Sequence, residues 1–247
     1  QPRSRGLGDV YKRQAENVAE KWNISRSSQE EFALESHMKS IYARDNGYFK
    51  SEICPITSDD GVIEEDGCIR NTSLEAMSKL NPVFANNGSV TAATSSPLTD
   101  GAVSMLVCSS EFAEKNGLEP LARVVTSAVT GCPPNIMGIG PISSTQKALE
   151  LSGWNIEDID VFEINEAFSS QSIAVINELS IDYHKVNIDG GAISIGHPLG
   201  ASGARIVGKA ASILYRTNSE KALATMCIGG GMGITCLLYT SPSPRDR

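Results

Sequence analysis

The first third of the chain alternates apolar and polar residues with a helical period. Between residues 15 and 47, apolar side chains recur every three or four positions in AENVAEKW and in SRSSQEEFALESHMKSIYARDNG. This spacing is typical of amphipathic helices that bury one face. Ser25, Ser27 or Ser28 is expected to cap the second helix, and Gly47 follows its end. We therefore predict two helices in this region.

The pattern from residue 48 to residue 120 is mixed. YFKSEICPIT (48–57) predicts a strand, and AVSMLVCS (102–109) predicts a buried strand. Short helices are expected at 74–79 and over SEFAEKNG, which ends at Gly117. Between the two helices, residues 81–101 are mostly small or hydroxyl-bearing, which indicates a long functional or flexible loop. The linker-like residues 118–120 mark an expected domain boundary.

Strand and helix patterns alternate regularly after residue 121. Strands are predicted at 122–129, at 158–164 and within 221–238, where glycines interrupt the pattern. Helices are predicted at 141–153, 165–179 and 201–216. Such alternation is typical of a layered α/β domain with helices covering a sheet.

Composition narrows the class of protein. The chain has 247 residues, 40% of them hydrophobic and 20% charged, which suits a folded globular domain. Its formal net charge of −8 argues against nucleic acid as the main partner. The six cysteines form no CxxC pair, which favours a reducing compartment over a disulfide framework. No apolar run approaches the roughly 20 residues of a membrane-spanning helix.

The two ends differ from the rest of the chain. Residues 1–14 hold four basic residues and one acidic residue with almost no apolar period, and residues 238–247 form a Ser/Pro/Arg tail. We interpret both as a non-native leader and tail and exclude them from fold reasoning. The alternative is a pair of flexible natural tails.

Candidate chemistry lies where predicted strands end and in a glycine-rich stretch. Asn165 follows a strand, so its amide could donate to an oxygen that gains charge, or simply cap a helix. His197 precedes Pro198 in NIDGGAISIGHPLGASGAR, and could activate a nucleophile or stabilise an oxyanion. His37 and His184 are interpreted as packing or surface residues.

Cys227 stands at the end of a predicted strand, directly before a run of glycines. A cysteine in such a place is usually an inert buried residue. Beside exposed glycine N–H groups it could instead move a proton, while the amide of Gly229 helps to hold an oxyanion. The glycines do not form a phosphate-binding P-loop, because no GxxxxGK[ST] is present.

Three motifs, NEAF, GGAxxxGHPxGASGAR and CxGGGxG, occur in this order and together resemble the thiolase family over residues 15–237. The segment VTAATSSPLTDGA resembles that family's coenzyme A loop, except that Ala93 and Thr94 replace the usual Gly-Asn. The resemblance implies an α/β fold of αβαβα layers, here incomplete. Its expected parts are a loop (CoA-binding) domain at 15–91, the remainder of the N-terminal half at 92–117 and the C-terminal half at 118–237.

The resemblance also implies residue roles. Asn165 would hold the water of one oxyanion hole, and His197 would be its other donor and the activator of the nucleophile. Cys227 would be the acid/base at the α-carbon, and the N–H of Gly229 would serve a second oxyanion hole. The residues expected to bind coenzyme A are Phe84, Ala92, Ser96 and Phe168, with Arg70 as a looser match.

The implied activity is an acyltransferase that joins two acetyl-CoA into acetoacetyl-CoA and CoA, reversibly, in a ping-pong reaction. The family's nucleophilic cysteine has no matching motif here, so this chain is expected to be a C-terminal fragment and to be inactive alone. The alternatives are a degradative 3-ketoacyl-CoA thiolase and a non-catalytic CoA-binding protein. Coenzyme A or acetyl-CoA is expected as substrate, with no permanently bound cofactor and no metal. The full-length protein is expected to be a cytoplasmic homodimer or homotetramer. No nucleic-acid or membrane partner is expected.

Overall fold

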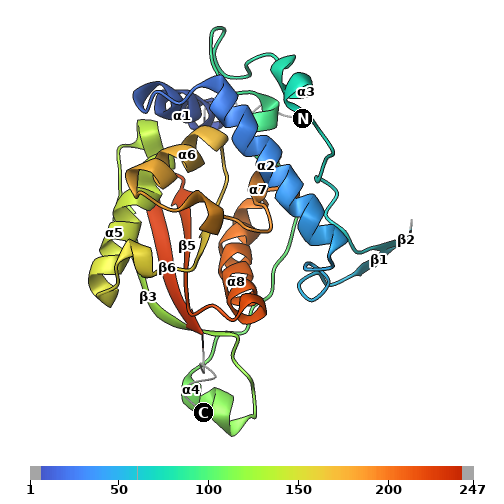
Figure 1. The fold of residues 1–247 in the computed structure, drawn as a ribbon, viewed down its shortest axis with the longest axis vertical. Helices are drawn as coiled ribbons and strands as arrows, with labels where there is room; N and C mark the ends of the chain where they lie inside the picture. The colour runs from blue at the N-terminus through green and yellow to red at the C-terminus, as the bar shows by residue number, and fades with distance from the viewer. Residues whose placement is uncertain (1–6, 60, 241–247) are drawn as a thin grey trace.

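The structure, a computed structural model, describes residues 7–59 and 61–240, and it begins with two long helices (Figure 1). α1 spans Leu7–Lys21 and α2 spans Arg26–Asp45. Ser25 caps α2, because its side chain accepts the backbone N–H of Ser28 at 3.1 Å. The cap therefore lies at the first of the three serines that the sequence offered.

α1 begins at Leu7, well before residue 15, so part of the stretch set aside as a leader is helical. A helix that is already nucleated extends by further turns at little cost, even where no apolar period marks it. At the other end, residues 238–240 complete a strand instead of a tail. Residues 1–6 and 241–247 lie outside the described residues.

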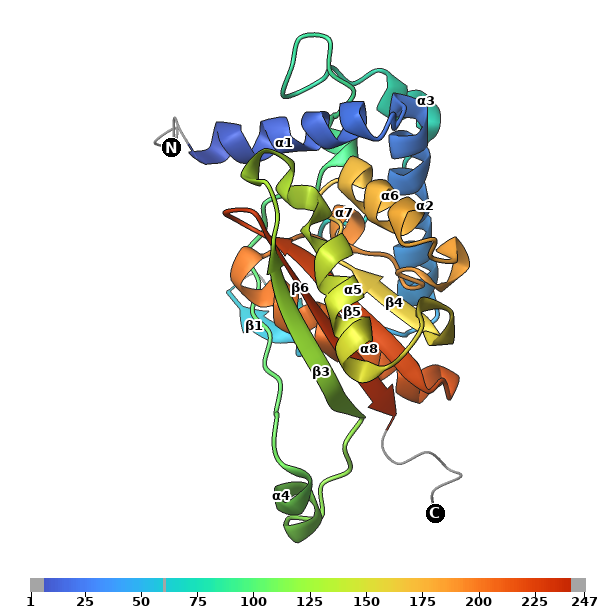
Figure 2. The ribbon, with the colours of Figure 1, turned by 90° about the vertical axis from the view of Figure 1, so that its left-hand side faces the viewer.

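The core is a four-stranded sheet in the order β3-β6-β5-β4 (Figure 2). The strands are β3 (Ala122–Gly131), β4 (Val161–Ile164), β5 (Lys221–Ile228) and β6 (Met232–Thr240). β4 runs parallel to β5, whereas β6 is antiparallel to both of its neighbours. All three strand regions predicted after residue 121 are confirmed.

Helices cover both faces of this sheet. α5 (Gly140–Ser152) and α6 (Ser169–Glu178) lie on one face, and α8 (Leu199–Thr217) lies on the other. Alternation along β5 separates the two cores: Leu223 packs with α5 and α6, whereas Ala222 and Ala224 pack with α8. The predicted helix–sheet–helix layering is therefore confirmed. Within the described ranges, no helix is both long and apolar enough to cross a bilayer.

Shorter elements connect these layers. They are β1 (Ile56–Ser58), β2 (Gly61–Ile63), α3 (Leu74–Ser78), α4 (Ser110–Lys115), α7 (Ala192–Ile195) and the 3₁₀ turns η1 (Ala92–Thr94), η2 (Pro134–Ile139), η3 (Ile156–Asp158) and η4 (Tyr183–Lys185). The two short helices predicted from sequence correspond to α3 and α4.

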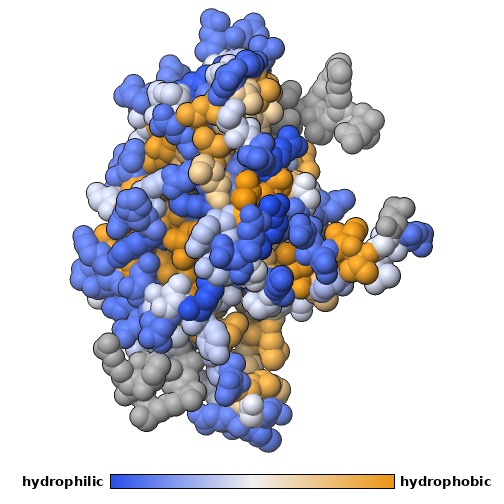
Figure 3. Space-filling view, turned by 45° about the vertical axis from the view of Figure 1, so that its right-hand side comes forward, coloured by the Kyte–Doolittle hydropathy of each residue, from blue (hydrophilic) through white to orange (hydrophobic). Residues whose placement is uncertain are grey.

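The strand predicted over 48–57 is largely wrong. Residues 47–52 form turns, and only β1 pairs, with β2, in a hairpin that projects from the body (Figures 1 and 3). The aromatic residues that suggested a strand pack elsewhere: the Phe49 ring lies under Lys209 Nζ, and the Tyr48 ring under the Arg216 guanidinium. Their apolar faces are thus used by α8 instead of by a sheet.

The buried strand predicted over 102–109 is also wrong. The segment is exposed and has no regular structure, with Leu106 73% and Val107 69% accessible. A strand needs a neighbour for its backbone N–H and C=O groups, and no neighbour is present among the described residues. The segment instead descends to α4 at the far end of the molecule (Figure 2).

Candidate active site

Asn165 follows the last residue of β4 and extends its pairing, since its backbone N–H donates to Thr225 O at 2.9 Å. The side chain is fully buried, and its Nδ2 lies 3.3 Å from Nε2 of His197. The capping alternative does not hold, because Phe168 occupies the N-cap position of α6. The other amide atom of Asn165, Oδ1, is buried and has no hydrogen-bond partner.

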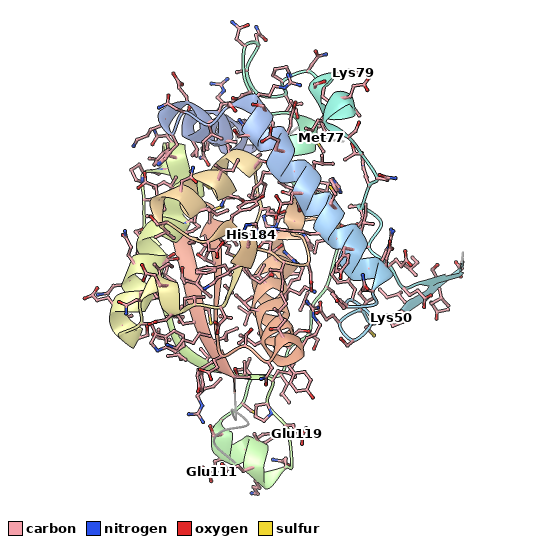
Figure 4. All side chains as sticks on the ribbon, in the orientation of Figure 1. Lys50, Met77, Lys79, Glu111, Glu119 and His184 are labelled. Carbon is pink, nitrogen blue, oxygen red and sulfur yellow. The ribbon has the colours of Figure 1, made fainter. Side chains whose placement is uncertain are left out.

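His197 lies between α7 and α8, in a turn that the sequence permits through Gly196, whose φ is +104°. Its ring is buried, with Nδ1 2.6 Å from Ser202 Oγ. Burial, assisted by the positive charge of Arg205, lowers the pKa of His197 to about 4. The imidazole is therefore neutral at pH 7 and can accept a proton. His184, by contrast, is exposed on η4 as expected (Figure 4).

Cys227 lies one residue before the end of β5, directly opposite Gly233 of β6. It is buried, and burial raises the pKa of its thiol to about 12. The thiol therefore stays protonated at pH 7 and is a strong base once deprotonated. Gly229 is exposed in the hairpin that follows, where Gly230 and Gly231 both have a φ of +93°.

A small cavity, with room for about one water molecule, adjoins Cys227. Phe168 of the NEAF motif and Gln171 of α6 line it beside the cysteine. The Gln171 side chain is fully buried, and neither atom of its amide has a hydrogen-bond partner. Sequence reasoning missed Gln171, because a glutamine in the first turn of a helix carries no distinctive signal.

The residues expected to bind coenzyme A fall into two groups. Phe84 and Phe168 meet edge to face with ring centroids 6.0 Å apart, and Ser96 donates through Oγ to Ala167 O at 3.1 Å. Ala92 lies exposed in η1, four residues before Ser96. Arg70 is exposed, and its backbone N–H contacts His37 of α2 at 3.2 Å, so the structure does not join it to the others.

The glycine-rich loop that carries His197 is anchored to α2. Glu166 accepts the hydroxyl of Ser36 at 2.7 Å, the amide of Asn187 at 2.7 Å and the N–H of Ile193 at 3.1 Å. Ser40 Oγ donates to Asp189 O at 3.1 Å. Glu166 is thus a structural partner of the loop, whereas its neighbour Asn165 faces the histidine.

A buried ion-pair cluster holds the same loop against α8. Lys209 Nζ lies 2.7 Å from Asp189 and 3.0 Å from both carboxylate oxygens of Glu52, and Arg216 binds Asp189 through two nitrogens at 2.8 and 2.7 Å. Burial alone would raise the pKa of Asp189, but the Arg216 and Lys209 contacts outweigh it and lower that pKa. Asp189 therefore stays ionised inside the protein.

Glu163 is another buried acid, and sequence reasoning passed over it. It lies on β4, two residues before Asn165, and its Oε1 has no hydrogen-bond partner. Burial raises the pKa of Glu163 to about 8, although the charges of Arg205 and Lys209 act in the opposite direction. A charged residue within the apolar run VFEI was the available signal.

Comparison with known proteins places these elements in a family. Family models described as "Thiolase, N-terminal domain" and "Thiolase, C-terminal domain" match residues 6–111 and 118–240. A protein of Paracoccus denitrificans named acetyl-CoA acetyltransferase is 46% identical over 91% of this chain and 59% of its own length.

Two solved structures of related enzymes are also similar to this chain. The crystal structure of the Bacillus anthracis acetyl-CoA acetyltransferase matches with a TM-score of 0.90 and 40% identity, over 93% of this chain and 60% of that one. The human mitochondrial 3-ketoacyl-CoA thiolase in complex with CoA matches with a TM-score of 0.91 and 41% identity, over 92% and 58%. The chain thus spans about 60% of the length of the relatives it matches.

Proposed function

This chain belongs to the thiolase family, and we propose that it supplies the acid/base half of an acetyl-CoA C-acetyltransferase site. That enzyme joins two acetyl-CoA into acetoacetyl-CoA and CoA, and runs the reverse thiolysis. The observation that carries the proposal is the contact between Asn165 Nδ2 and His197 Nε2 at 3.3 Å. It brings a hydrogen-bond donor and a neutral base together at the end of β4, and the neighbouring strand β5 carries Cys227.

Each residue has a distinct proposed task. Cys227 moves the proton of the α-carbon: its thiolate takes the proton in condensation, and its thiol returns it in thiolysis. The amide of Asn165, directly or through a water molecule, donates to the thioester oxygen as the enolate forms. His197 takes the proton of a reacting thiol and afterwards donates it from the same nitrogen. The N–H of Gly229 is proposed to serve a second oxyanion.

The nucleophile of the ping-pong step is assigned to none of the other cysteines. Cys54 and Cys108 are exposed, and Cys68, Cys132 and Cys236 are half-buried. The nitrogens of His197 instead contact Ser202 and Asn165. We therefore expect these 247 residues not to complete acyl transfer by themselves.

Coenzyme A is proposed as the substrate carrier, with no permanently bound cofactor. Its pantetheine arm would pass Phe84, Ala92, Ser96 and Phe168, three of which gather around residues 167–168. A cytoplasmic location and a homodimer or homotetramer complete the proposal.

Proton exchange tests the proposal on the chain as it exists. In D₂O, the chain is expected to exchange the methyl protons of acetyl-CoA, followed by NMR, because this step needs Cys227 and Asn165 but no acyl-enzyme. Cys227→Ala should lower the exchange rate at least about 100-fold. Only the thiolate acts as base, and the pKa of Cys227 is about 12, so the thiolate fraction rises about tenfold per pH unit from pH 7 to 9. The exchange rate of the unmodified chain minus that of Cys227→Ala should rise by the same factor.

Cys236→Ala is the matched control, since Cys236 is half-buried on β6 and packs with the α8 core. It should exchange like the unmodified chain. Acetyl-CoA binding without exchange would instead favour the non-catalytic CoA-binding alternative, and the absence of both would refute the proposal.

A degradative 3-ketoacyl-CoA thiolase is the second candidate, favoured by the 41% identity to the human mitochondrial enzyme. Calorimetry distinguishes the two. The first proposal expects acetoacetyl-CoA to bind at least as tightly as a medium-chain 3-ketoacyl-CoA, and the second expects the longer ligand to bind more tightly.

A further inference from the structure

The imidazole of His197 has a different neighbour at each nitrogen. Nδ1 lies 2.6 Å from Ser202 Oγ, and Nε2 lies 3.3 Å from Asn165 Nδ2. Burial keeps the pKa of His197 well below neutrality, so a single ring proton must occupy one of these nitrogens. The tautomer decides which nitrogen is the base.

The Asn165 side determines the state of Nε2. In this structure the Asn165 amide turns its nitrogen to the ring, and because an amide nitrogen only donates, Nε2 presents its lone pair to Nδ2. The opposite tautomer would bring two N–H donors face to face at 3.3 Å in a buried site. The ring proton is therefore on Nδ1.

The Ser202 side agrees. A serine hydroxyl has one hydrogen, and Pro198 O, which lies 3.0 Å from Ser202 Oγ at the N-cap of α8, gives that hydrogen an acceptor other than the imidazole. A carbonyl oxygen only accepts, so the hydroxyl oxygen is left to accept from Nδ1–H at 2.6 Å. Both neighbours of the ring therefore fit the same tautomer, with the proton on Nδ1.

We propose that Ser202 is a positioning residue that holds the proton of His197 on Nδ1 and thereby presents Nε2 as the free base of the site. The chemical use of Nε2 rests on the proposed function, but the tautomer itself does not. Ser202 touches no reacting atom and acts only through the imidazole. A hydroxyl at this position can accept from Nδ1 while its own hydrogen stays on the helix backbone.

His37 serves as an internal reference, because its ring is expected to carry the opposite tautomer. His37 is buried in α2, and its Nδ1 accepts the backbone N–H of Arg70 at 3.2 Å. Its ring proton must therefore be on Nε2. Since the sequence has only three histidines and His184 is exposed, each ring can be recognised in one spectrum.

Nitrogen NMR of the ligand-free chain, with ¹⁵N in both histidine ring nitrogens, measures the tautomers directly. The expected spectrum shows a protonated Nδ1 for His197 and a protonated Nε2 for His37, with His197→Gln identifying the first pair of signals. Ser202→Ala removes the acceptor of Nδ1–H. The tautomer ratio of His197 should then move by about tenfold towards Nε2–H, the value of one lost hydrogen bond, while His37 stays unchanged.

Two further variants separate positioning from folding. Ser202→Thr keeps the hydroxyl and should restore the original spectrum, whereas Ser202→Cys keeps the volume with a weaker acceptor and should shift as the alanine does. Ser144→Ala removes another fully buried helix hydroxyl, which bonds Thr235, and should leave His197 unchanged.

A protonated Nε2 in the unmodified chain, or an unchanged ratio in both Ser202→Ala and Ser202→Cys, would overturn the proposal. If the alanine variant does not fold, the unmodified, threonine and cysteine spectra decide the question. Because no substrate is present, failure here is distinct from failure of proton exchange into acetyl-CoA.

Discussion

Replacing Gly190 by alanine is expected to lower the free energy of unfolding by about 3 kcal/mol. Gly190 has a φ of +82°, a conformation that costs a residue with a Cβ roughly 1–2 kcal/mol. An added Cβ would also lie 2.6 Å from Ser36 O and 2.9 Å from Ser40 N, both backbone atoms of α2. A methyl group forced into such a packed contact costs typically 1–3 kcal/mol more. The loop that carries His197 must then move away from α2.

Urea denaturation followed by circular dichroism measures this loss. Gly208→Ala is the matched control, because Gly208 is inside α8 and, apart from its chain neighbours and the nearby backbone of that helix, no heavy atom lies within 4 Å of its would-be Cβ. Alanine there should raise stability by about 0.5–1 kcal/mol, the usual preference of a helix interior. A Gly190→Ala protein within about 0.5 kcal/mol of the unmodified chain would contradict the close packing of α2 on this loop.

Glu163→Gln is expected to remove a pH dependence of stability worth roughly 3–4 kcal/mol between pH 5 and pH 8. Burial raises the folded-state pKa of Glu163 from 4.5 to about 8, so the folded protein binds more protons than the unfolded chain in this window. The contribution of Glu163 to the free energy of unfolding therefore falls as the pH rises through this window. It is complete only below the unfolded-state pKa. Glutamine cannot ionise, so the variant should lack this contribution and be the more stable protein at pH 8.

Denaturation midpoints at pH 5, 6, 7 and 8 follow the effect. Burial also raises the pKa of Glu166, so the unmodified protein and the variant share a residual slope, and their difference isolates Glu163. Glu119→Gln, at an exposed acid beyond α4, is the control and should follow the unmodified curve (Figure 4). Parallel curves for Glu163→Gln and the unmodified chain would contradict a protonated Glu163.

Local periodicity predicted the helices along the whole chain and the strands after residue 121, but the two strands predicted before residue 120 were wrong. β4, α6 and α8 carry their own apolar periods, so the sequence was sufficient to find them. Residues 102–109 carry an equally apolar run, yet a strand also needs a partner, and no local pattern reports one. Phe49 looked like a strand residue because local spacing does not distinguish packing against a cation on α8 from packing in a sheet.

The site was predictable to a similar degree. The resemblance singled out Asn165 and His197, and the structure brings them together across 32 residues. Whether their roles are those of the family remains a prediction. Ser202 was missed because a serine in the first turn of a helix is common. Its position relative to Nδ1 depends on how α8 departs from the glycine-rich loop, which only the three-dimensional structure determines.

The attachment of the glycine-rich loop to α2 has a consequence for the order of folding. Ser36 and Ser194 are separated by 158 residues and Ser36 and Gly191 by 155, so these contacts close most of the chain into one loop. To form such contacts, the chain must first lose the conformational entropy of a long loop, before any hydrogen bond offsets that cost. Long-range contacts therefore form slowly. Helices such as α5 and α8 can form from local contacts, whereas the histidine loop reaches its final geometry only after α2 has docked. Refolding experiments should therefore detect the environment of His197 as one of the last parts to become native.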